Sequence, residues 1–288
     1  MSQPLILDLD DSVRPLPGTR SIGLTNYQEA IRFGCRKKVL NELGRELASI
    51  LDTFPPVVFM GSGDFHHISY LIIERLRKLD TRIQVVVFDN HPDNMRYPFG
   101  IHCGSWVWHV SRLPFVARVH VVGITSTDVE GGHLWENHLT PLYSGKVAYW
   151  CVQRNLRAMN LIGISHSHTC PTVANVLNEF FATLATMPEP IYLSIDKDVL
   201  ARDVVQTNWD QGFMRLEELM TAIGLLGSRI IASDVVGEVS SYRYHSRFKR
   251  FLSGLDGQSQ ISDKTMAEWQ AQHQQVNLQL LSLLHHAR

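Results

Sequence analysis

Short apolar runs alternate along this chain with longer segments of helical periodicity. The apolar runs predict strands at Leu5–Leu9, Val57–Met60, Ile83–Phe88, Val116–Ile124, Lys146–Cys151, Asn160–Ile164, Ile191–Ile195 and Arg229–Val235. Apolar residues three or four positions apart predict helices at Tyr27–Leu51, Ile68–Leu79, Pro171–Met187, Phe213–Leu226 and Thr265–His286. This alternation predicts an α/β fold, with a central, mostly parallel sheet flanked by helices on both faces.

The pattern runs from end to end and favours a single domain over residues 1–288, without internal repeats. The segment Ser240–Lys264 is rich in Ser, Gly, Arg and Tyr, which is typical of a loop beside a site or a tether for the last helix. That helix carries an apolar stripe, Val276, Leu280, Leu283 and Leu284. The stripe suits packing on the chain's own sheet or a contact between copies, so a homo-oligomer stays an open alternative.

Composition narrows the classes of function. The 288 residues are 44% hydrophobic, and 27 Lys and Arg balance 28 Asp and Glu to a net charge of -1. This balance gives no electrostatic reason to expect nucleic acid or an anionic membrane as the partner. We see no apolar stretch near the roughly 20 residues of a membrane span, and no secretory signal at the start. Four widely spaced cysteines without a CxxC pair favour a reducing compartment. We therefore expect a cytoplasmic protein with a small-molecule substrate.

Acidic and imidazole side chains directly follow four of the predicted strands. The segments are Gly61–His67, Asp89–Asp93, Asp196–Asp198 and Asp234–Glu238. Ligands of open parallel sheets bind outside the carboxyl ends of the strands, so these side chains are expected to meet there. Carboxylates gathered at one point repel each other strongly unless a cation compensates their charge. The pattern therefore favours one or two divalent cations.

Spacing within the motifs supports this hypothesis. Asp89, His91 and Asp93 stand two residues apart, so in extended backbone they would point to one side. Asp196 and Asp198 repeat the arrangement. A single D-x-D also occurs as a helix cap or surface turn, but the two motifs together favour metal binding. Oxygen ligands with one or two imidazoles suit Mn²⁺, and four carboxylates suit a two-metal site.

These motifs resemble those of the arginase/agmatinase/formiminoglutamase (ureohydrolase) family. Asp89–Asp93 resembles its D-A-H-x-D motif, Ser194–Asp198 its S-x-D-x-D motif, and Gly61–His66 stands at its G-G-D-H motif. Thr207–Glu218 is similar to its glycine-containing loop before a helix, and Asp234–Glu238 to its D-x-x-E strand end. The family's order is kept over residues 57–238, which form the motif-bearing core.

The resemblance implies an arginase-like fold and a metal-dependent hydrolase of non-peptide C–N bonds in linear amidines. Its substrate would be a small guanidino, formimino or amide compound, attacked by a hydroxide bridging two Mn²⁺ ions per chain. Carried over by position, Asp89 and Asp196 would bridge the ions. His66 and Asp93 would complete one ion's ligand set, and His91 and Asp198 the other's.

The resemblance also implies catalytic roles. Gly100–Gly104 resembles the family's H-G segment, which makes His102 the proton shuttle. Glu238 would pair with a guanidinium substrate, and Asp93 belongs to the catalytic set as a ligand. The departures concern the first motif, where Asp64, His66 and His67 are alternative ligands, and Gly237, an apparent insertion. Residues 94–99 lack an obvious set of groups for an amino acid's α-carboxylate and α-amine, so substrate identity does not transfer.

Other interpretations stay open. A metal-binding pseudo-enzyme of the same fold would keep the cluster without turnover. Leu5–Val13 fits hhhDxDx[ST]V, which is similar to haloacid-dehalogenase-like phosphatases, with Asp8 phosphorylated and Asp10 as acid/base. The alternating histidines of Ser165–His168 would line the pocket in a further alternative. Lys197 stands between two candidate ligands and either tunes the site or faces solvent.

Overall fold

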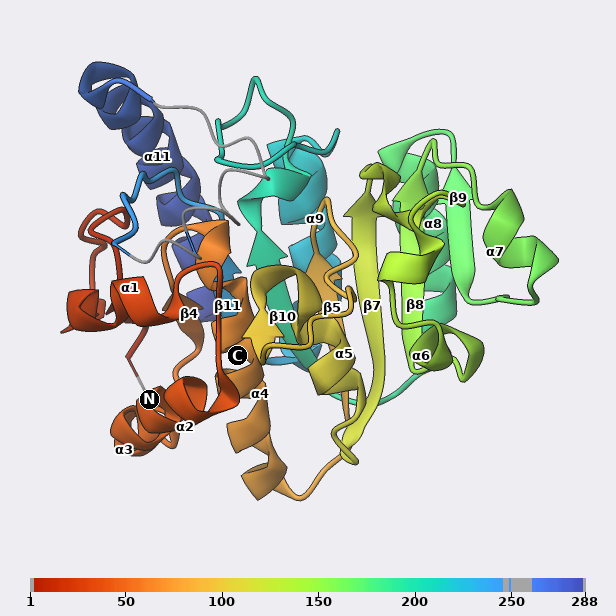
Figure 1. Cartoon of the computed structure of the whole chain (residues 1–288), viewed down its shortest axis with the longest axis horizontal. Coiled ribbons are helices and arrows are strands. Elements are labelled where there is room, and N and C mark those ends of the chain that lie inside the picture. The colour runs from red at the N-terminus through yellow and green to blue at the C-terminus, as the bar shows by residue number, and fades with distance from the viewer. Residues whose placement is uncertain (1–2, 246–248, 250–260, 287–288) are drawn as a thin grey trace.

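The central feature of the computed structural model is a nine-stranded sheet of order β2-β1-β4-β11-β10-β5-β7-β8-β9, in which all neighbouring strands are parallel (Figure 1). The structure describes residues 3–245, 249 and 261–286. The strands are β1 (Leu5–Asp8), β2 (Arg20–Gly23), β4 (Val57–Phe59), β5 (Ile83–Phe88), β7 (Val116–Ile124), β8 (Val147–Val152), β9 (Ser167–Cys170), β10 (Ile191–Asp196) and β11 (Ile230–Val236).

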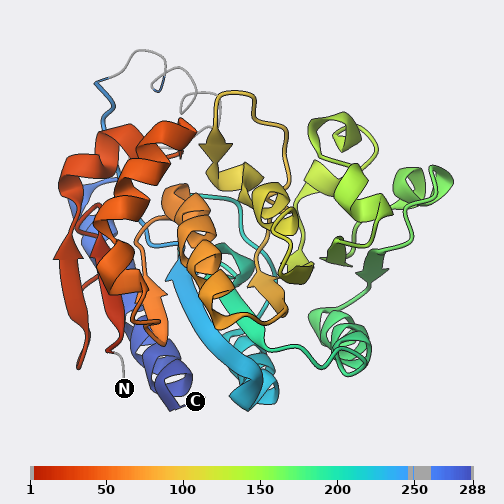
Figure 2. The same ribbon diagram turned by 90° about the horizontal axis from the view of Figure 1, so that it is seen from below.

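Helices cover both faces of this sheet (Figure 2). The helices are α1 (Gln28–Ile31), α2 (Lys37–Glu46), α3 (Ala48–Leu51), α4 (Ser69–Arg75), α5 (Trp106–Ser111), α6 (Thr140–Tyr143), α7 (Arg157–Leu161), α8 (Val173–Leu184), α9 (Leu216–Leu226) and α11 (Asp263–His286). Among the described helices, none is long and apolar enough to cross a membrane.

Side chains of the central strands divide between two apolar cores. In β5, Val85 and Val87 join a cluster with residues of α2, α4 and α5, whereas Val86 and Phe88 join one with residues of α8, α9 and α11. Successive side chains of a strand point to opposite faces, so a strand that is buried on both faces must be apolar throughout. The predicted α/β fold, with a mostly parallel sheet and helices on both faces, is confirmed.

The last helix packs on its own sheet. Val276, Leu280 and Leu284 of α11 are buried in the second core, and Leu283 packs against it. Of the two interpretations of this apolar stripe, the structure shows packing on the chain's own sheet. Residues 246–248 and 250–260, most of the predicted loop or tether, lie outside the described residues.

The prediction of one helix over Tyr27–Leu51 is wrong. The chain forms α1, then the two-residue strand β3 (Gly34–Cys35), then α2 and α3. Phe33 adopts a φ of 72° between them, and its amide donates to the Asp64 carbonyl at 2.9 Å. Strand β3 pairs with β6 (Ile101–His102). These long-range contacts override a helical pattern that is correct only locally.

Two strand assignments at the sheet edges also differ. The predicted strand Asn160–Ile164 is wrong, because Arg157–Leu161 forms α7. The edge strand is β9, which pairs with β8 and has the polar sequence Ser-His-Thr-Cys. The other edge strand, β2, is mostly exposed and is not among the predicted strands. Edge strands of this kind lack the continuous apolar run that identifies a buried strand.

One histidine of the core links protonation to stability. His120 on β7 is fully buried, and the Trp150 Nε1–H donates to its Nδ1 at 3.2 Å. Burial, with smaller contributions from Arg118 and His168, lowers the pKa of His120 from 6.5 to about 3. The folded protein therefore keeps this imidazole uncharged at pH values where the unfolded chain protonates it.

We predict that His120 makes the protein less stable in weak acid. Its contribution is fully present above about pH 6.5 and is lost as the pH falls toward the folded-state pKa, because only the unfolded chain takes up the proton. Between pH 7 and pH 5 the parent chain should lose about 2 kcal/mol more unfolding free energy than His120→Gln. Urea denaturation of the metal-free proteins measures this difference. Equal losses in the two proteins would contradict the assignment.

Candidate metal centre

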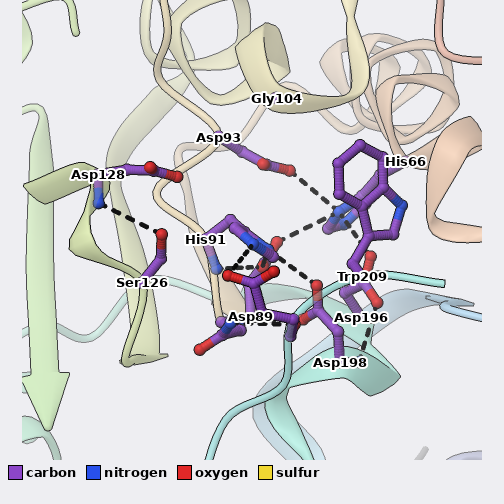
Figure 3. Close-up of polar contacts among 12 residues, drawn as sticks. His66, Asp89, His91, Asp93, Gly104, Ser126, Asp128, Asp196, Asp198 and Trp209 are labelled. Atoms are coloured by element: carbon purple, nitrogen blue, oxygen red, sulfur yellow. Dashed lines mark hydrogen bonds and ion pairs between the residues drawn. The ribbon is translucent and has the colours of Figure 1, made fainter. Parts of the chain in front are cut away.

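The carboxyl ends of β4, β5 and β10 bring the predicted ligands together. The 3₁₀ helix η2 (Gly63–Ile68) follows β4 and carries His66. Residues 89–93 follow β5, and β10 ends at Asp196, before the 3₁₀ helix η7 (Lys197–Val199). Figure 3 shows the side chains of these segments pointing toward one another. These segments meet because β4, β11, β10 and β5 are consecutive parallel strands of the sheet, so their carboxyl ends lie along one edge.

Two groups of possible ligands share Asp89. The first is His66, Asp89 and Asp93, and the second is Asp89, His91 and Asp198, each with its ligand atoms within 4.8 Å of one another. His66 Nδ1 lies 3.3 Å from Asp89 Oδ2 and 3.1 Å from Asp93 Oδ2. His91 Nδ1 lies 2.9 Å from Asp198 Oδ2. The resemblance implies the same pairs, with His66 and Asp93 on one ion, His91 and Asp198 on the other, and Asp89 shared.

Asp196 is a neighbour of both groups and a member of neither. Its Oδ2 lies 3.5 Å from His66 Nδ1, and its Oδ1 accepts the Asp198 amide at 3.0 Å. A side-chain atom on Gly63 would meet Asp196 Oδ2 at 2.8 Å, and one on Gly237 would come closer still to Oδ1. Glycine at these two positions therefore leaves the room that the Asp196 carboxylate occupies.

The ligands converge through turns, and the prediction of extended backbone is wrong. Asp89 Oδ1 accepts the amide of His91 at 2.6 Å, as Asp196 does for Asp198. Aspartate favours such local turns because its carboxylate reaches the amide two residues later. Asp93 has a φ of 46°, which turns the chain once more. In both motifs the spacing of two residues therefore lets an aspartate side chain accept the backbone amide of the next candidate ligand.

Of the three alternatives in the first motif, His66 is the one that faces the cluster. Asp64 instead accepts from Arg32 Nε at 2.7 Å and from Trp209 Nε1 at 3.1 Å. His67 Nε2 lies 3.9 Å from Cys35 Sγ. All three side chains are buried, so their orientation, and not their exposure, separates them.

A chain of hydroxyl groups orients His66. Ser194 Oγ donates to Asp234 Oδ1 at 2.8 Å, and Asp234 also accepts from the Tyr192 hydroxyl. Ser194 Oγ lies 2.8 Å from His66 Nε2 and, having given its proton to Asp234, accepts from that nitrogen. In the neutral ring that a metal ligand requires, the His66 lone pair is then on Nδ1, toward the carboxylates. A hydrogen bond that fixes the ring in this way is typical of metal-binding histidines.

Further support comes from residues that sequence analysis did not assign to the site. The Trp106 Nε1–H donates to Asp93 Oδ2 at 2.7 Å, and the Asn90 amide donates to Asp198 Oδ1 at 3.0 Å. Asn90 is fixed in turn, since its Oδ1 accepts the Thr125 amide at 3.1 Å. The motif contained Asn90, but no spacing rule relates Trp106 or Thr125 to the ligands.

The cluster is electrostatically expensive without cations. Burial, and then the charge of Asp89, raises the pKa of Asp93 to about 7, and the same two causes raise that of Asp198 to about 6. Burial and Asp198 raise the pKa of Asp196 as well. Burial also acts to raise the pKa of Asp89, but the two neighbouring imidazoles, His66 and His91, together outweigh it and hold that pKa at about 2. Protons would therefore compete with a bound metal ion for these carboxylates.

His102 lines the same cavity as the six predicted ligands. Its Nδ1 accepts the Gly104 amide at 2.9 Å, so the neutral ring carries its proton on Nε2. Burial, with a smaller contribution from Lys249, lowers the pKa of His102 to about 3. The imidazole is therefore uncharged at neutral pH and offers one N–H donor.

Glu238, predicted to bind the substrate, is not among the described residues that line the cavity. Its Oε1 accepts from the ammonium of Lys197 and, at 2.6 Å, from Asn277 Nδ2 of α11. Lys197 is completely buried and also donates to Asn277 Oδ1 at 2.9 Å. The lysine between the two aspartates thus does not face solvent. The pair joins the segment of the candidate ligands Asp196 and Asp198 to the last helix.

The alternating histidines and the aspartates near β1 have partners of their own. Among the described residues, neither His166 nor His168 lines the cavity, and His168 stacks on Trp150 with ring centroids 4.3 Å apart. The side chain of Asp10 is only 1% exposed and accepts from Ser240 Oγ and from Ser12 Oγ, each at 2.6 Å. Asp8 accepts the Asp11 amide at 3.0 Å. These aspartates serve the fold around β1.

Comparison with known proteins identifies the class of this fold and site. The model of the Arginase family matches residues 19–247, and the chain therefore belongs to that family. The haloacid-dehalogenase-like alternative is accordingly wrong. An uncharacterized protein of Thermotoga maritima is 29% identical over 207 residues, which cover 71% of this chain and 67% of that protein.

Solved structures show the same fold at low identity. An arginase from Bacillus subtilis matches with a TM-score of 0.55 and 16% identity, over 96% of this chain and 97% of that one. Agmatine ureohydrolase of Thermoplasma volcanium matches with 0.52 and 12%, over 85% and 70%. Trypanosoma cruzi formiminoglutamase with Mn²⁺ matches with 0.53 and 10%, over 87% and 71%. The arginase-like fold predicted from the motifs is thus confirmed.

We predict that Ser194→Ala weakens Mn²⁺ binding about 10- to 100-fold, because His66 loses the partner that keeps its lone pair on Nδ1. Titration calorimetry measures the affinity. Ser111→Ala is the matched control, since Ser111 Oγ donates to the Trp108 carbonyl at 2.8 Å on α5, away from the cluster. Equal affinities for the parent and Ser194→Ala would contradict the role of this hydroxyl.

We predict that Glu238→Gln destabilises the fold by about 3–5 kcal/mol, because it leaves the buried Lys197 ammonium without its counter-charge. The double variant Lys197→Met/Glu238→Gln should regain much of this loss, since no uncompensated charge remains. Urea denaturation of metal-free protein gives both values. A stable Glu238→Gln protein whose KM for substrate alone rises would instead restore the predicted substrate contact.

Proposed function

We propose that this chain hydrolyses a non-peptide C–N bond in a small guanidino, formimino or amide compound. In this proposal His66, Asp89, His91, Asp93, Asp196 and Asp198 hold two Mn²⁺ ions. The observation that carries it is the pair of ligand groups that share Asp89 at the carboxyl edge of an arginase-family sheet. All six side chains also line one cavity, so a substrate in it would reach the ions.

The residues present fit such ions. The donors are carboxylate oxygens and imidazole nitrogens without sulfur, which suits Mn²⁺ better than a thiolate metal. Asp89 Oδ2 is buried and has no hydrogen-bond partner among the described residues, as expected of an oxygen kept for a cation. Divalent ions bound here would lower the pKa of a water molecule and stabilise negative charge on the reacting carbon's substituents.

The chain's own groups supply the remaining functions. Ser194 keeps His66 oriented, and Trp106 holds the Asp93 carboxylate in place. His102 lines the cavity and is the proposed proton shuttle. Its neutral ring offers a hydrogen bond from Nε2–H, and it would take up the proton that the attacking water releases before it gives one to the leaving amine. We assign no substrate contact to Glu238, since Lys197 and Asn277 occupy its Oε1 oxygen.

The cellular setting belongs to the proposal. No disulfide joins the four cysteines, all of which lie in the described part of the chain. Buried thiols of this kind support a reducing compartment, and we infer a cytoplasmic enzyme with a small-molecule substrate.

We predict that the protein loaded with Mn²⁺ binds close to two ions and releases urea, formamide or ammonia from a guanidino, formimino or amide compound. Asp196→Ala and the isosteric Asp196→Asn should lose both metal and turnover, because Asp196 neighbours both ligand groups and is proposed to help hold the two ions. Elemental analysis and a product screen give the two readouts. Asp203→Ala is the control, since Asp203 is exposed and pairs with Arg215 at the surface.

The outcomes separate the alternatives. Two bound ions without turnover of any compound in the screen would identify a metal-binding pseudo-enzyme. Turnover that survives in Asp196→Ala with unchanged metal content would overturn the proposed site.

A further inference from the structure

The cavity beside the metal cluster is walled by aromatic side chains. It measures about 450 Å³, within the range of cavities that take drug-sized ligands. A guanidino or formimino group alone would leave much of this space unfilled. Outside the predicted ligands, the aromatic and other apolar lining residues include Phe33, Met95, Tyr97, Pro98, Phe99 and Trp209.

One part of this wall is held rigidly next to a candidate ligand. The rings of Phe33 and Trp209 stack at 14° with centroids 6.1 Å apart, and Trp209 meets the His91 ring edge-on at 6.1 Å. The Trp209 Nε1–H donates to buried Asp64, which also binds the buried Arg32 guanidinium. The indole plane is therefore fixed, and Phe33 is placed by the left-handed turn that ends α1.

A second part of the wall comes from the loop between β5 and β6. Tyr97 and Phe99 meet edge-on with centroids 5.6 Å apart, and Tyr97 lies 5.0 Å from the His102 ring. The loop's base is tied down, since the Met95 amide donates to the Gly104 carbonyl at 2.9 Å. Phe99 nevertheless exposes 59% of its surface. Phe99 also lines the cavity, so part of its exposed apolar surface is open to a ligand there.

The charged lining residues are partly engaged by the protein. Besides the predicted ligands, they are Arg96, Asp128 and Glu136. Arg96 Nε donates to the Asn137 carbonyl at 3.1 Å, and Glu136 lies 3.1 Å from the His133 ring nitrogen. An amino-acid substrate needs separate partners for its carboxylate and its ammonium group. Arg96 and Glu136 each have a protein partner already, which such a substrate would have to share.

We propose that the substrate carries its C–N group on an aromatic or other flat apolar body, which packs against Phe33 and Trp209 and is bordered by Tyr97 and Phe99. This inference rests on the proposed function, because the metal cluster at the same cavity sets where the reacting group lies. Tyr97 and Phe99 are then specificity-determining residues. Aromatic side chains prefer stacked or edge-on partners, so a substrate ring would bury apolar surface there and also find favourable ring–ring contacts.

The experiment compares benzamidine with acetamidine, which share the amidinium group and differ by a phenyl ring in place of a methyl group. Arginine serves as the zwitterionic probe. Calorimetry on the full chain, before and after Mn²⁺ loading, should show benzamidine binding at least about tenfold tighter than acetamidine, because the ring buries apolar surface. Phe99→Ala should reduce this ratio severalfold. Because Phe99 is largely exposed, its truncation leaves the fold intact.

Tyr143→Ala is the matched control, since Tyr143 is an exposed aromatic residue on α6 that is not among the described cavity residues. Its affinity ratio should equal that of the parent. Equal affinities for the two amidines, or arginine binding tighter than benzamidine, would overturn this inference even if hydrolysis of another C–N compound is found. Ring-selective binding without any hydrolysis would instead overturn the proposed function and leave the inference standing.

Discussion

The main constraint on this structure is the repulsion among four buried carboxylates at the carboxyl edge of a parallel sheet. Asp89, Asp93, Asp196 and Asp198 share this edge with two imidazoles, and burial raises the pKa of three of the four. Such a cluster is tolerable only with protons or with cations. The parallel sheet imposes the cost, because neighbouring strands end side by side, and the same adjacency gives the shared Asp89 its two sets of partners.

Around the cluster, neutral hydrogen bonds set orientation and one ion pair secures the scaffold. Ser194 and Asp234 determine which nitrogen of His66 faces the carboxylates. Lys197, which lies between the candidate ligands Asp196 and Asp198 in the sequence, forms a buried ion pair with Glu238. Asn277 of α11 donates to the same Glu238 carboxylate. A buried pair of this kind adds little net stability, yet breaking it is costly. The fold of the last helix and the geometry of the candidate centre are thereby connected.

Outside the cluster, the cavity is aromatic. The contrast between a highly polar floor and an apolar wall suits a substrate with one polar reacting group and one flat apolar part. The wall is assembled from segments far apart in the chain, since Phe33 precedes β3, Phe99 precedes β6 and Trp209 lies before α9. The candidate ligands and the aromatic wall, which we propose to set reaction and substrate choice, therefore come largely from different segments of the same fold.

The sequence alone determined the fold class and the five converging side chains at the ends of β5 and β10, because buried parallel strands require continuous apolar runs and these two runs end in short polar motifs. The tertiary structure alone decided which residue of the first motif faces the cluster, since Asp64, His66 and His67 are close in sequence and differ only in direction. It also broke the predicted helix at Phe33 and turned Glu238 toward Lys197. Periodicity describes which face of an element is buried, whereas these outcomes depend on partners tens to hundreds of residues away.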